Sequence, residues 1–270
     1  KDLYQGFAIQ LHDFVQQTKI TPRLDVILIG DNPASQLYVQ NKQRMCSIYG
    51  IQSHVHHLPA TAAETQVFAL IDELNSTPYI HGILLQLPLP PHLDSFSLLS
   101  RIHPLKDVDG LHPENLGALM HNRPRLIPCT PLGCLQLIHS YRADITGAKA
   151  LVVGRSVLVG KPMALLLTHH NATVTSAHSQ SRDLAELCRQ AEILVVAVGV
   201  AHLIKGDWLT KNAIVIDVGM NRDATGGLCG DVESSHANVA AITTVPGGVG
   251  PLTIANLLNN TLKAAQYQQC

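Results

Sequence analysis

Short, continuously apolar runs alternate along this chain with longer stretches in which apolar residues recur at helical spacing. In the first half, one apolar run leads into a Gly-Asp-Asn-Pro turn, the helical stretch behind it stops at Gly50, and a later run is broken by Pro88 and Pro90. These signals predict strands at residues 25–30, 51–58 and 82–87 and helices at residues 34–48 and 64–74. Continuously apolar strands that alternate with helices are typical of a parallel sheet with both faces covered.

The rhythm is interrupted in the middle of the chain and then starts again. Residues 101–131 hold seven prolines or glycines and show little periodicity, which predicts a long crossing segment between two domains. After the glycine-rich stretch 246–251, residues 252–267 predict one amphipathic helix that packs back on the first domain. Between these regions we expect four parallel strands joined by helices, at residues 150–153, 173–176, 193–198 and 213–218.

The predicted fold class is therefore α/β with two domains. Residues 1–130, together with the C-terminal helix at 251–270, would form an N-terminal α/β domain with a parallel sheet. Residues 131–250 would form a second α/β domain.

Composition and charge narrow the class of partner. Apolar residues make up 46% of the 270 residues and charged residues 14%, which is typical of a globular protein and excludes a disordered one. The formal net charge of −1 leaves no basic surface for nucleic acid or anionic lipid, so a small molecule is the expected partner. No apolar run approaches the roughly 20 residues that span a bilayer. No signal-peptide pattern opens the chain, although it begins at Lys1 without a Met, so a segment upstream of it can be missing.

Cysteines and histidines give no predicted metal site. The six cysteines form no C-x-x-C pair, and scattered thiols fit a reducing cytosol, so we expect a cytoplasmic protein. Among the 15 histidines, His54, His56 and His57 form the densest cluster, and alternation puts His54 and His56 on one strand face. A surface metal site is one interpretation of that cluster. The favoured one is a solvated strand face, because no carboxylate or cysteine lies nearby in the sequence.

A glycine turn between a predicted strand and a predicted helix indicates a dinucleotide site. Residues 151–162 (LVVGRSVLVGKP) place Gly154 where a dinucleotide-binding fold seats its pyrophosphate, on amide N–H groups at a helix N-terminus. The pattern departs from G-x-G-x-x-G, because Ser156 replaces the second glycine and Gly160 comes one position late. A plain strand-to-helix turn is the alternative.

The next predicted strand indicates which cofactor binds. An acidic residue about twenty positions after the turn would hold the ribose 2′-hydroxyl of NAD. Residues 175–179 (TSAHS) contain no carboxylate, and the first one follows at Asp183. The guanidinium of Arg155 would meet a 2′-phosphate instead, with Ser179 as a hydroxyl partner. NADP is therefore the predicted cofactor.

Polar residues of the first domain form a candidate catalytic group. Tyr38 and Lys42 lie four positions apart on a predicted helix, so both side chains leave the same face. Gln86 ends a buried strand, where an unpaired polar side chain is costly. Asp109 follows shortly beyond that strand. Because ligands of open α/β sheets bind at the carboxyl ends of the strands, Lys42, Gln86 and Asp109 would converge on one rim. We therefore expect residues 1–130 with 251–270 to be the substrate and catalytic domain and residues 131–250 to be a Rossmann-like NADP-binding domain, with the active-site cleft between the two. The alternatives are a solvated lysine beside a half-buried tyrosine, and an aspartate that stabilises a turn before Gly110.

These residues together resemble the bifunctional methylenetetrahydrofolate dehydrogenase/cyclohydrolase family. The sequence departs from the family at His81, where an acidic residue is common, and at the amino terminus, which lacks the family's first short strand. The matching blocks cover nearly the whole chain in order: residues 30–35, 38–39, 42, 82–90, 103–110, 128–131, 154–162, 216–221, 230–232 and 245–251.

The resemblance implies two linked reactions and a role for each candidate residue. Methylenetetrahydrofolate would give a hydride to NADP, and water would open the resulting methenyl cation to 10-formyltetrahydrofolate. Lys42 would be the central catalytic group, chiefly of the hydrolytic step, with Gln86 hydrogen-bonded to it. Tyr38 would stack on the folate and Asp109 would bind the pterin edge. The other implied residues are Leu85, Leu87, Pro246, Gly247, Gly248, Val249 and Gly250 in the substrate pocket, with Gln86, and Gly154, Arg155, Ser156, Ser179 and the backbone of Met220 at the cofactor.

The resemblance also implies partners and leaves two other functions open. Tetrahydrofolate derivatives would be the substrates, a homodimer is the family expectation, and no metal is implied. The first open alternative is a folate dehydrogenase with weak or no cyclohydrolase activity, against which Lys42 and Gln86 argue. The second is a nucleotide-binding regulatory protein on the same fold, which would not need this polar group.

Overall fold

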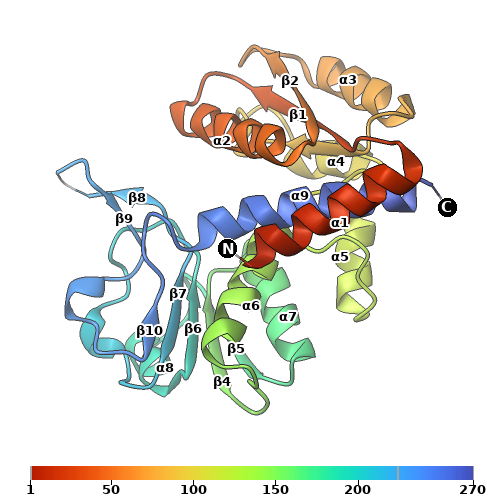
Figure 1. Ribbon diagram of the computed structural model, residues 1–270. Coiled ribbons are helices and arrows are strands. Elements are labelled where there is room, and N and C mark those ends of the chain that lie inside the picture. The colour runs from red at the N-terminus through yellow and green to blue at the C-terminus, as the bar shows by residue number, and fades with distance from the viewer. Residues whose placement is uncertain (1, 224, 270) are drawn as a thin grey trace. The chain divides into compact units, whose positions relative to one another are not determined.

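The computed structural model describes residues 2–223 and 225–269, which divide into two compact units (Figure 1). The first unit contains the residues up to 118, residues 124–127 and the residues from 254 onward; the second contains residues 119–123 and 128–253. The sequence-based boundaries, 1–130 with 251–270 and 131–250, differ from these units by a few residues where the chain crosses. The predicted two-domain α/β class with parallel sheets is confirmed.

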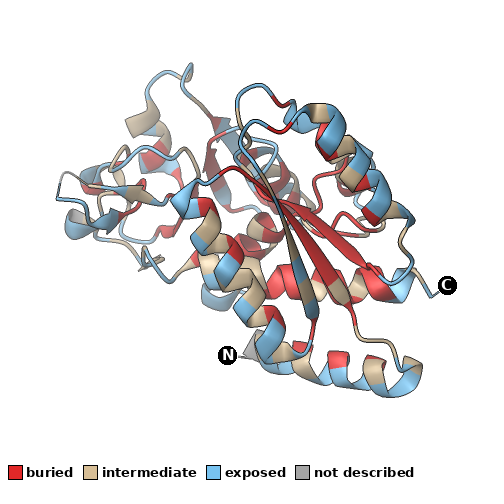
Figure 2. Cartoon of the chain, turned by 90° about the horizontal axis from the view of Figure 1, so that it is seen from above, coloured by how far each residue is buried: buried red, intermediate tan, exposed pale blue. Residues whose placement is uncertain are grey.

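The first unit is built on a three-stranded parallel sheet in the order β2-β1-β3. β1 and β3 are buried almost throughout, whereas β2, at the edge, has exposed positions along its length (Figure 2). A core that includes Ile27, Val67, Ile71, Leu85 and Leu98 fills the space between one sheet face and two helices. The elements are β1 (Arg23–Ile29), β2 (Gln52–Leu58), β3 (Gly82–Leu85), α1 (Asp2–Thr18), α2 (Pro33–Tyr49), α3 (Glu64–Ser76), α4 (Ser95–Arg101), and most of α5 (Pro113–Met120) and α9 (Val249–Tyr267).

Local sequence fixes where α2 begins and ends. The Asn32 side chain accepts hydrogen bonds from the N–H groups of the first turn, and Pro33 occupies the first helical position, where its missing N–H costs nothing. Gly50 ends the helix in the left-handed region, with φ of 79°. Because β1 leads directly into this helix, Tyr38 and Lys42 lie one turn apart near the carboxyl end of the sheet.

Five parallel strands form the sheet of the second unit, in the order β10-β7-β6-β4-β5. From β4 the chain passes to one side for β5 and to the other side for β6, so the strand order reverses at β4. In doubly wound sheets, ligands bind at such a reversal, outside the carboxyl ends of the strands. The elements are α6 (Cys129–Tyr141), β4 (Lys149–Val153), α7 (Gly160–His169), β5 (Thr173–Ala177), α8 (Leu184–Gln190), β6 (Ile193–Val196), η1 (Gly206–Trp208), β7 (Ile214–Asp217), the hairpin strands β8 (Asn221–Arg222) and β9 (Leu228–Cys229), η2 (Ser234–His236) and β10 (Ala241–Ile242).

Two regions differ from the sequence-based expectation. The chain does pass between the two units within residues 101–131, but this segment also contains α5 and the start of α6, for which no helix was predicted. With eight residues, α5 is too short to show a clear hydrophobic period. Residues 2–18 form α1, for which no element was predicted, although Phe7, Leu11 and Phe14 recur at helical spacing and are buried.

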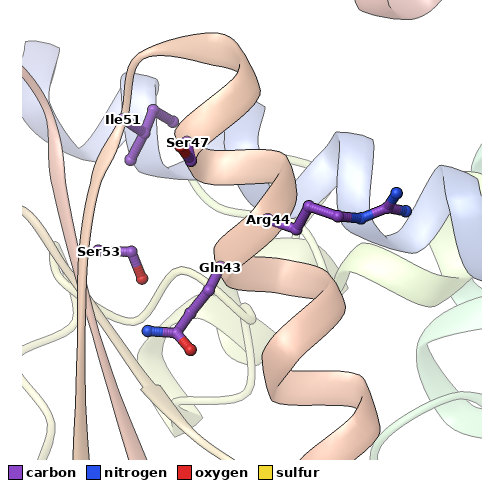
Figure 3. Close-up of a pocket in the computed structure, with 5 residues that line it drawn as sticks. All are labelled: Gln43, Arg44, Ser47, Ile51 and Ser53. Atoms are coloured by element: carbon purple, nitrogen blue, oxygen red, sulfur yellow. The ribbon is translucent and has the colours of Figure 1, made fainter.

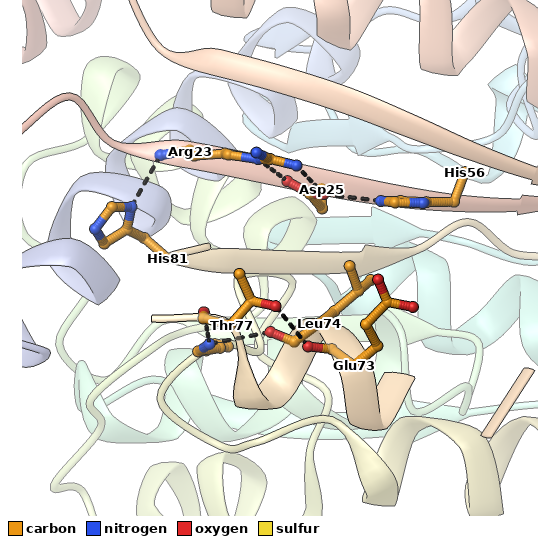
Figure 4. A network of polar contacts seen from close by, with 8 residues as sticks. Arg23, Asp25, His56, Glu73, Leu74, Thr77 and His81 are labelled. Atoms are coloured by element: carbon orange, nitrogen blue, oxygen red, sulfur yellow. Dashed lines mark hydrogen bonds and ion pairs between the residues drawn. The ribbon is translucent and has the colours of Figure 1, made fainter. Parts of the chain in front are cut away.

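A polar network occupies the amino end of the first sheet (Figure 4). The fully buried Asp25 carboxylate accepts hydrogen bonds from Arg23 Nε at 2.6 Å and Arg23 Nη2 at 2.8 Å, and it lies 2.8 Å from His56 Nε2. The expectation that no carboxylate lies near these histidines therefore holds only along the sequence, since strand pairing brings Asp25 to His56. Among the described residues, no group of three His, Cys, Asp or Glu side chains is arranged to hold a metal ion.

His81 and Lys106 complete this network from the side of β3. The backbone N–H of Arg23 donates to His81 Nδ1 at 3.1 Å (Figure 4). Lys106 Nζ donates to the carbonyls of Leu74, Asn75 and Thr77 at the C-terminal end of α3. His81 precedes β3 and Gln86 follows it, so these two side chains leave opposite ends of the same strand. The network therefore holds the sheet together at the end away from Gln86.

Stability is expected to fall in weak acid because of His81. Its pKa lies below the ordinary value, chiefly because burial disfavours the charged imidazole and secondly because the Lys106 ammonium lies near. Below about pH 6.5 the unfolded chain takes up a proton that the folded chain resists, so the free energy of unfolding decreases by at most ~1.4 kcal/mol per pH unit until the folded pKa is reached. Urea unfolding of the wild type and of His81→Gln over this range measures the difference. An identical pH dependence in the two proteins would contradict the assignment.

The described cysteines are all buried. Cys46, Cys129, Cys134, Cys188 and Cys229 are buried and free, and Cys270 lies outside the described residues. Burial raises the pKa of Cys134 to about 12 and of Cys46 and Cys188 to about 11, so these three thiols stay protonated at neutral pH. In the part of the chain that the structure describes, no helix is long and apolar enough to span a membrane.

Candidate functional site

The structure joins Lys42 and Gln86 directly. Lys42 Nζ donates a hydrogen bond of 2.9 Å to Gln86 Oε1, although 44 positions separate the two residues in the chain. Lys42 is half-buried on α2, and Gln86 is 9% exposed at the carboxyl end of β3. The Gln86 amide oxygen thus fixes the position of the lysine nitrogen at the carboxyl end of β3.

Backbone contacts fix the orientation of the Gln86 amide. Its N–H donates to the carbonyl of Ile27 at 2.9 Å, which extends the pairing of β1 and β3 by one residue. Its side-chain nitrogen donates to the carbonyl of Leu87 at 2.6 Å. Because the nitrogen is engaged there, the oxygen of the amide is the atom that points to Lys42. The pair lies where the strand order of the first sheet reverses, at β1.

Tyr38 and the two leucines lie in the same unit as Lys42. Tyr38 is half-buried one turn before Lys42 on α2, and burial raises the pKa of its phenol, which therefore stays protonated. Leu85 is the last residue of β3 and is buried, whereas Leu87, behind Gln86, is half-buried. An aromatic ring, apolar side chains and a polar pair thus occupy neighbouring positions on α2 and behind β3.

Asp109 belongs to a segment that is fastened along β3. The N–H of Ile83 donates to the carbonyl of Lys106 at 2.7 Å, and Asn260 Nδ2 of α9 donates to the carbonyl of Val108 at 2.9 Å. A side chain at Gly82 would collide with Val108, so the close approach of the segment depends on that glycine. Asp109 itself is half-buried. Its segment is held in a defined position beside the strand that ends at Gln86.

The glycine turn of the second unit has the geometry that its sequence predicts. Gly154 follows β4 directly and has φ of 122°, and a Cβ at this position would lie 2.5 Å from the carbonyl oxygen of Ala197. Any other residue is excluded by both the backbone angle and the lack of space. Gly160 begins α7, and a Cβ there would collide with the backbone of Gly154. The turn and the helix start therefore pack closely, as a phosphate-binding turn requires.

Arg155, Ser156 and Ser179 are exposed around this turn. Ser156 Oγ accepts a hydrogen bond from the N–H of Val159 at 3.1 Å, which shapes the loop before α7. The N–H of Gly154 donates to the carbonyl of Ala177 at 2.8 Å, so the loop after β5 that carries Ser179 begins beside the turn that carries Arg155. A cationic and a hydroxyl side chain are thus available at neighbouring strand ends, where a 2′-phosphate would bind.

The remaining predicted residues also belong to the second unit. Met220 is 44% exposed on the loop after β7. Residues 246–250 lead into α9, with Gly247 in the left-handed region (φ 99°) and Val249 buried as the first residue of the helix. The substrate-pocket residues implied by the resemblance are therefore divided, with Tyr38, Leu85, Gln86, Leu87 and Asp109 in the first unit and residues 246–250 in the second.

Two surface grooves contain none of the predicted site residues. The larger has a volume of about 490 Å³ and lies between α2 and the edge strand β2, where the Gln43 and Ser53 side chains border it (Figure 3). It is lined by Gln43, Arg44, Ser47, Ile51 and Ser53. The smaller, of about 200 Å³, lies between β4, β5 and α8. Sequence neighbours of Lys42 line the first groove, but Lys42 does not.

Two aspartates carry no signal in the sequence that marks them individually. Asp217 is 4% exposed at the end of β7, and Asp231 is fully buried behind β9. Burial raises the pKa of Asp217, and hydrogen bonds from the N–H groups of Asp231, Val232 and Gly219 oppose that rise. Both lie in blocks that carry the family resemblance, yet only their contacts in the folded chain indicate what they do.

Comparisons with known proteins agree along nearly the whole chain. Residues 1–109 match the family described as tetrahydrofolate dehydrogenase/cyclohydrolase, catalytic domain, and residues 128–269 match the NAD(P)-binding domain of the same family. A curated relative, "Bifunctional protein FolD 2" of Ectopseudomonas mendocina (strain ymp), is 54% identical over 254 residues, which cover 92% of this chain and 84% of that protein.

Two solved structures of the same family are similar to this chain over nearly its whole length. The bifunctional enzyme FolD, methylenetetrahydrofolate dehydrogenase/cyclohydrolase, from Campylobacter jejuni has a TM-score of 0.94 and 42% identity and covers 98% of this chain and 95% of its own. The Trypanosoma brucei methylenetetrahydrofolate dehydrogenase-cyclohydrolase, solved with NADP cofactor and an inhibitor, has a TM-score of 0.94 and 35% identity and covers 99% and 94%.

Proposed function

Because this chain belongs to the tetrahydrofolate dehydrogenase/cyclohydrolase family, we propose that it catalyses both reactions in the family's name. It oxidises methylenetetrahydrofolate to the methenyl cation with NADP, and it hydrolyses that cation to 10-formyltetrahydrofolate. The observation that supports the second activity most directly is the hydrogen bond of 2.9 Å between Lys42 Nζ and Gln86 Oε1.

The hydrolytic step needs a group that exchanges protons. Water adds to the cationic methenyl carbon and releases a proton; one C–N bond then breaks as its nitrogen takes up the proton of the new hydroxyl group. Lys42 is the group that we assign to accept and return these protons. A cationic substrate disfavours a second positive charge beside it, so a lysine in contact with it gives up its proton more readily. Gln86 holds the lysine nitrogen in place without neutralising the substrate's charge.

The residues of the first unit would also bind the folate. Tyr38 offers a protonated phenol ring for stacking on the flat pterin, and Leu85 and Leu87 offer apolar contacts. Asp109 would accept hydrogen bonds from the pterin edge, because a carboxylate pairs well with adjacent N–H donors. Residues 246–250 of the second unit are the other positions that the family resemblance assigns to the folate, and their glycines allow close backbone approach.

The residues around β4 fit NADP. When bound, NADP supplies the hydride acceptor of the first reaction. The tight turn at Gly154, where no Cβ fits, would let a pyrophosphate approach the backbone at the start of α7, and Ser156 lies on the loop between them. Arg155 would pair with the 2′-phosphate together with Ser179, and the backbone of Met220 would contact the cofactor from the loop after β7.

We further propose that the protein works in the cytoplasm as a homodimer. Five free, buried cysteines are consistent with a reducing compartment. The dimer is inferred from the family alone, and sedimentation of the purified protein tests it directly.

An absorbance assay of the wild-type protein tests the proposed function. With methylenetetrahydrofolate and NADP⁺ we expect NADPH and the methenyl product to form, and with methenyltetrahydrofolate alone we expect hydrolysis faster than in buffer. NADPH formation without enzymatic hydrolysis would leave a dehydrogenase only. The absence of both reactions, in a protein that binds NADP⁺, would favour a nucleotide-binding regulatory protein instead.

A further inference from the structure

Two segments of the second unit are hydrogen-bonded to one buried carboxylate. Asp231 Oδ2 accepts hydrogen bonds from the N–H groups of Val198 at 2.8 Å and Gly199 at 3.1 Å. Its Oδ1 accepts from the N–H of Val200 at 2.9 Å and from Asn221 Nδ2 at 2.9 Å. The loop after β6, and the start of β8 at the end of the loop after β7, are therefore held to the segment behind β9 by a single side chain.

Asp217 supports this arrangement from the end of β7. Its Oδ1 accepts hydrogen bonds from the N–H groups of Gly219 at 2.9 Å and Asp231 at 3.0 Å, and its Oδ2 accepts from Val232 at 2.9 Å. A Cβ at Gly219 would collide with the Asp231 carboxylate. The backbone is thus drawn close to both carboxylates, and we call Asp217 and Asp231 together the aspartate clamp.

Stability alone does not explain the aspartate clamp, because burying two carboxylates costs desolvation free energy. Burying a carboxylate is unfavourable unless hydrogen bonds replace its water, and here nearly all of those bonds come from loop backbone. What such bonds provide is a fixed loop conformation, because each N–H that points at a carboxylate cannot rotate away. The conformation of both loops is therefore fixed before a ligand binds.

The loops that the clamp fixes lie beside the cofactor turn. The N–H of Ala197 donates to the carbonyl of Val153, and Gly154 packs against the carbonyl of Ala197, so the loop after β6 starts next to the glycine turn. Val200 and Met220, on the two clamped loops, are 50% and 44% exposed. These loops combine an anchored backbone with exposed apolar side chains, and they lie where the strand order reverses. Such a surface is suited to contact a ligand.

We propose that Asp231, supported by Asp217, is a positioning residue that sets the affinity for the nicotinamide half of NADP without touching it. This inference rests on the proposed NADP site. Arg155 follows β4 and Ser179 follows β5, and these two residues would hold the adenosine half. The clamped loops follow β6 and β7, on the other side of the reversal, where the second half of a dinucleotide binds.

Binding of two probes to the full chain tests the inference. Isothermal titration with NADP⁺ measures both halves of the cofactor, whereas titration with adenosine 2′,5′-bisphosphate measures the adenosine half alone. The test variants are Asp231→Asn, Asn221→Ala, which removes one bond to Asp231, and Asn221→Asp, which places a second carboxylate against it. The matched control is Asp223→Asn, a half-buried aspartate of the same unit whose carboxylate accepts hydrogen bonds from Thr225 and Gly227 in its own turn.

We expect Asp231→Asn and Asn221→Asp to weaken NADP⁺ binding about tenfold and Asn221→Ala to weaken it less. Binding of the bisphosphate and the cofactor-independent cyclohydrolase activity should change by less than about twofold in every variant. Asp223→Asn should match the wild type in all three measurements. If Asp231→Asn does not fold, the two Asn221 variants decide.

Two results would overturn the aspartate clamp as a positioning device. The first is unchanged NADP⁺ affinity in Asn221→Asp; the second is an equal loss of both probes, which would indicate a general loss of domain structure. A wild-type protein that binds NADP⁺ but oxidises no folate would remove the proposed dehydrogenase activity and leave the clamp intact. A wild type that binds no NADP⁺ would overturn both.

Discussion

Replacing Lys42 with Met is expected to lower the rate of methenyltetrahydrofolate hydrolysis by about three orders of magnitude, within the range that a positioned acid–base group contributes. The methionine keeps the length and apolar stem of the side chain but cannot donate to Gln86 Oε1 or exchange a proton. Because Lys42 is half-buried on the surface of α2 and not part of the core, the fold and NADP binding should be retained.

The control for this prediction lies two residues along the same helix. Arg44→Met also removes a positive charge from α2, but Arg44 is exposed and lines the groove between α2 and β2. We expect its hydrolysis rate to stay within about twofold of the wild type. Rates are followed by the loss of methenyl absorbance, corrected for hydrolysis in buffer. Formation of 10-formyltetrahydrofolate by Lys42→Met at the wild-type rate would remove Lys42 from the mechanism.

The parts of the fold that were predictable are those in which the local pattern and the tertiary structure agree. β1 and β3 are apolar on both faces because helices cover both faces, so their sequences read as continuous runs. The helix α2 begins at an Asn-Pro pair and ends at Gly50, which are strong local signals. In contrast, α5 is short and begins at a proline, and no helix was predicted over α1, although its apolar residues have helical spacing.

The candidate site was predictable where topology determines proximity. Lys42 and Gln86 follow strands that pair in parallel, so their carboxyl ends meet and the two side chains come within hydrogen-bond distance. Gly154 was predictable because only glycine adopts its backbone angle in the space available. The proximity of Lys42 and Gln86 follows from the strand order, and the turn at Gly154 follows from the conformational freedom of glycine.

The aspartate clamp and the Asp25–His56 pair were not predictable in the same way. Asp231 binds backbone N–H groups from residues more than thirty positions earlier, and any sequence supplies such groups. Asp25 meets His56 across 31 positions because β1 and β2 pair in one particular register. A buried carboxylate in an apolar run signals that a partner exists, but only the folded chain identifies it.

Replacing Arg155 with Ala is expected to weaken NADP⁺ binding by roughly thirtyfold to a hundredfold while leaving NAD⁺ binding nearly unchanged. The two cofactors differ only in the 2′-phosphate, so a residue that contacts this group affects one of them alone. Arg155 is exposed beside Gly154, next to the start of the loop that carries Ser179, and no carboxylate occupies residues 175–179 to take its place on a ribose.

The measurement is the dissociation constant of each cofactor in the wild type, in Arg155→Ala and in a control, Arg189→Ala. Arg189 is an exposed arginine of the same unit, 3.5 Å from Glu186 on α8, and its loss should affect neither cofactor. Cyclohydrolase activity, which needs no cofactor, should be equal in all three proteins. Since the loss of a 2′-phosphate contact cannot reduce the affinity for NAD⁺, an equal reduction for both cofactors would show that Arg155 supports the turn itself. In that case the preference for NADP would have to come from another group near β5.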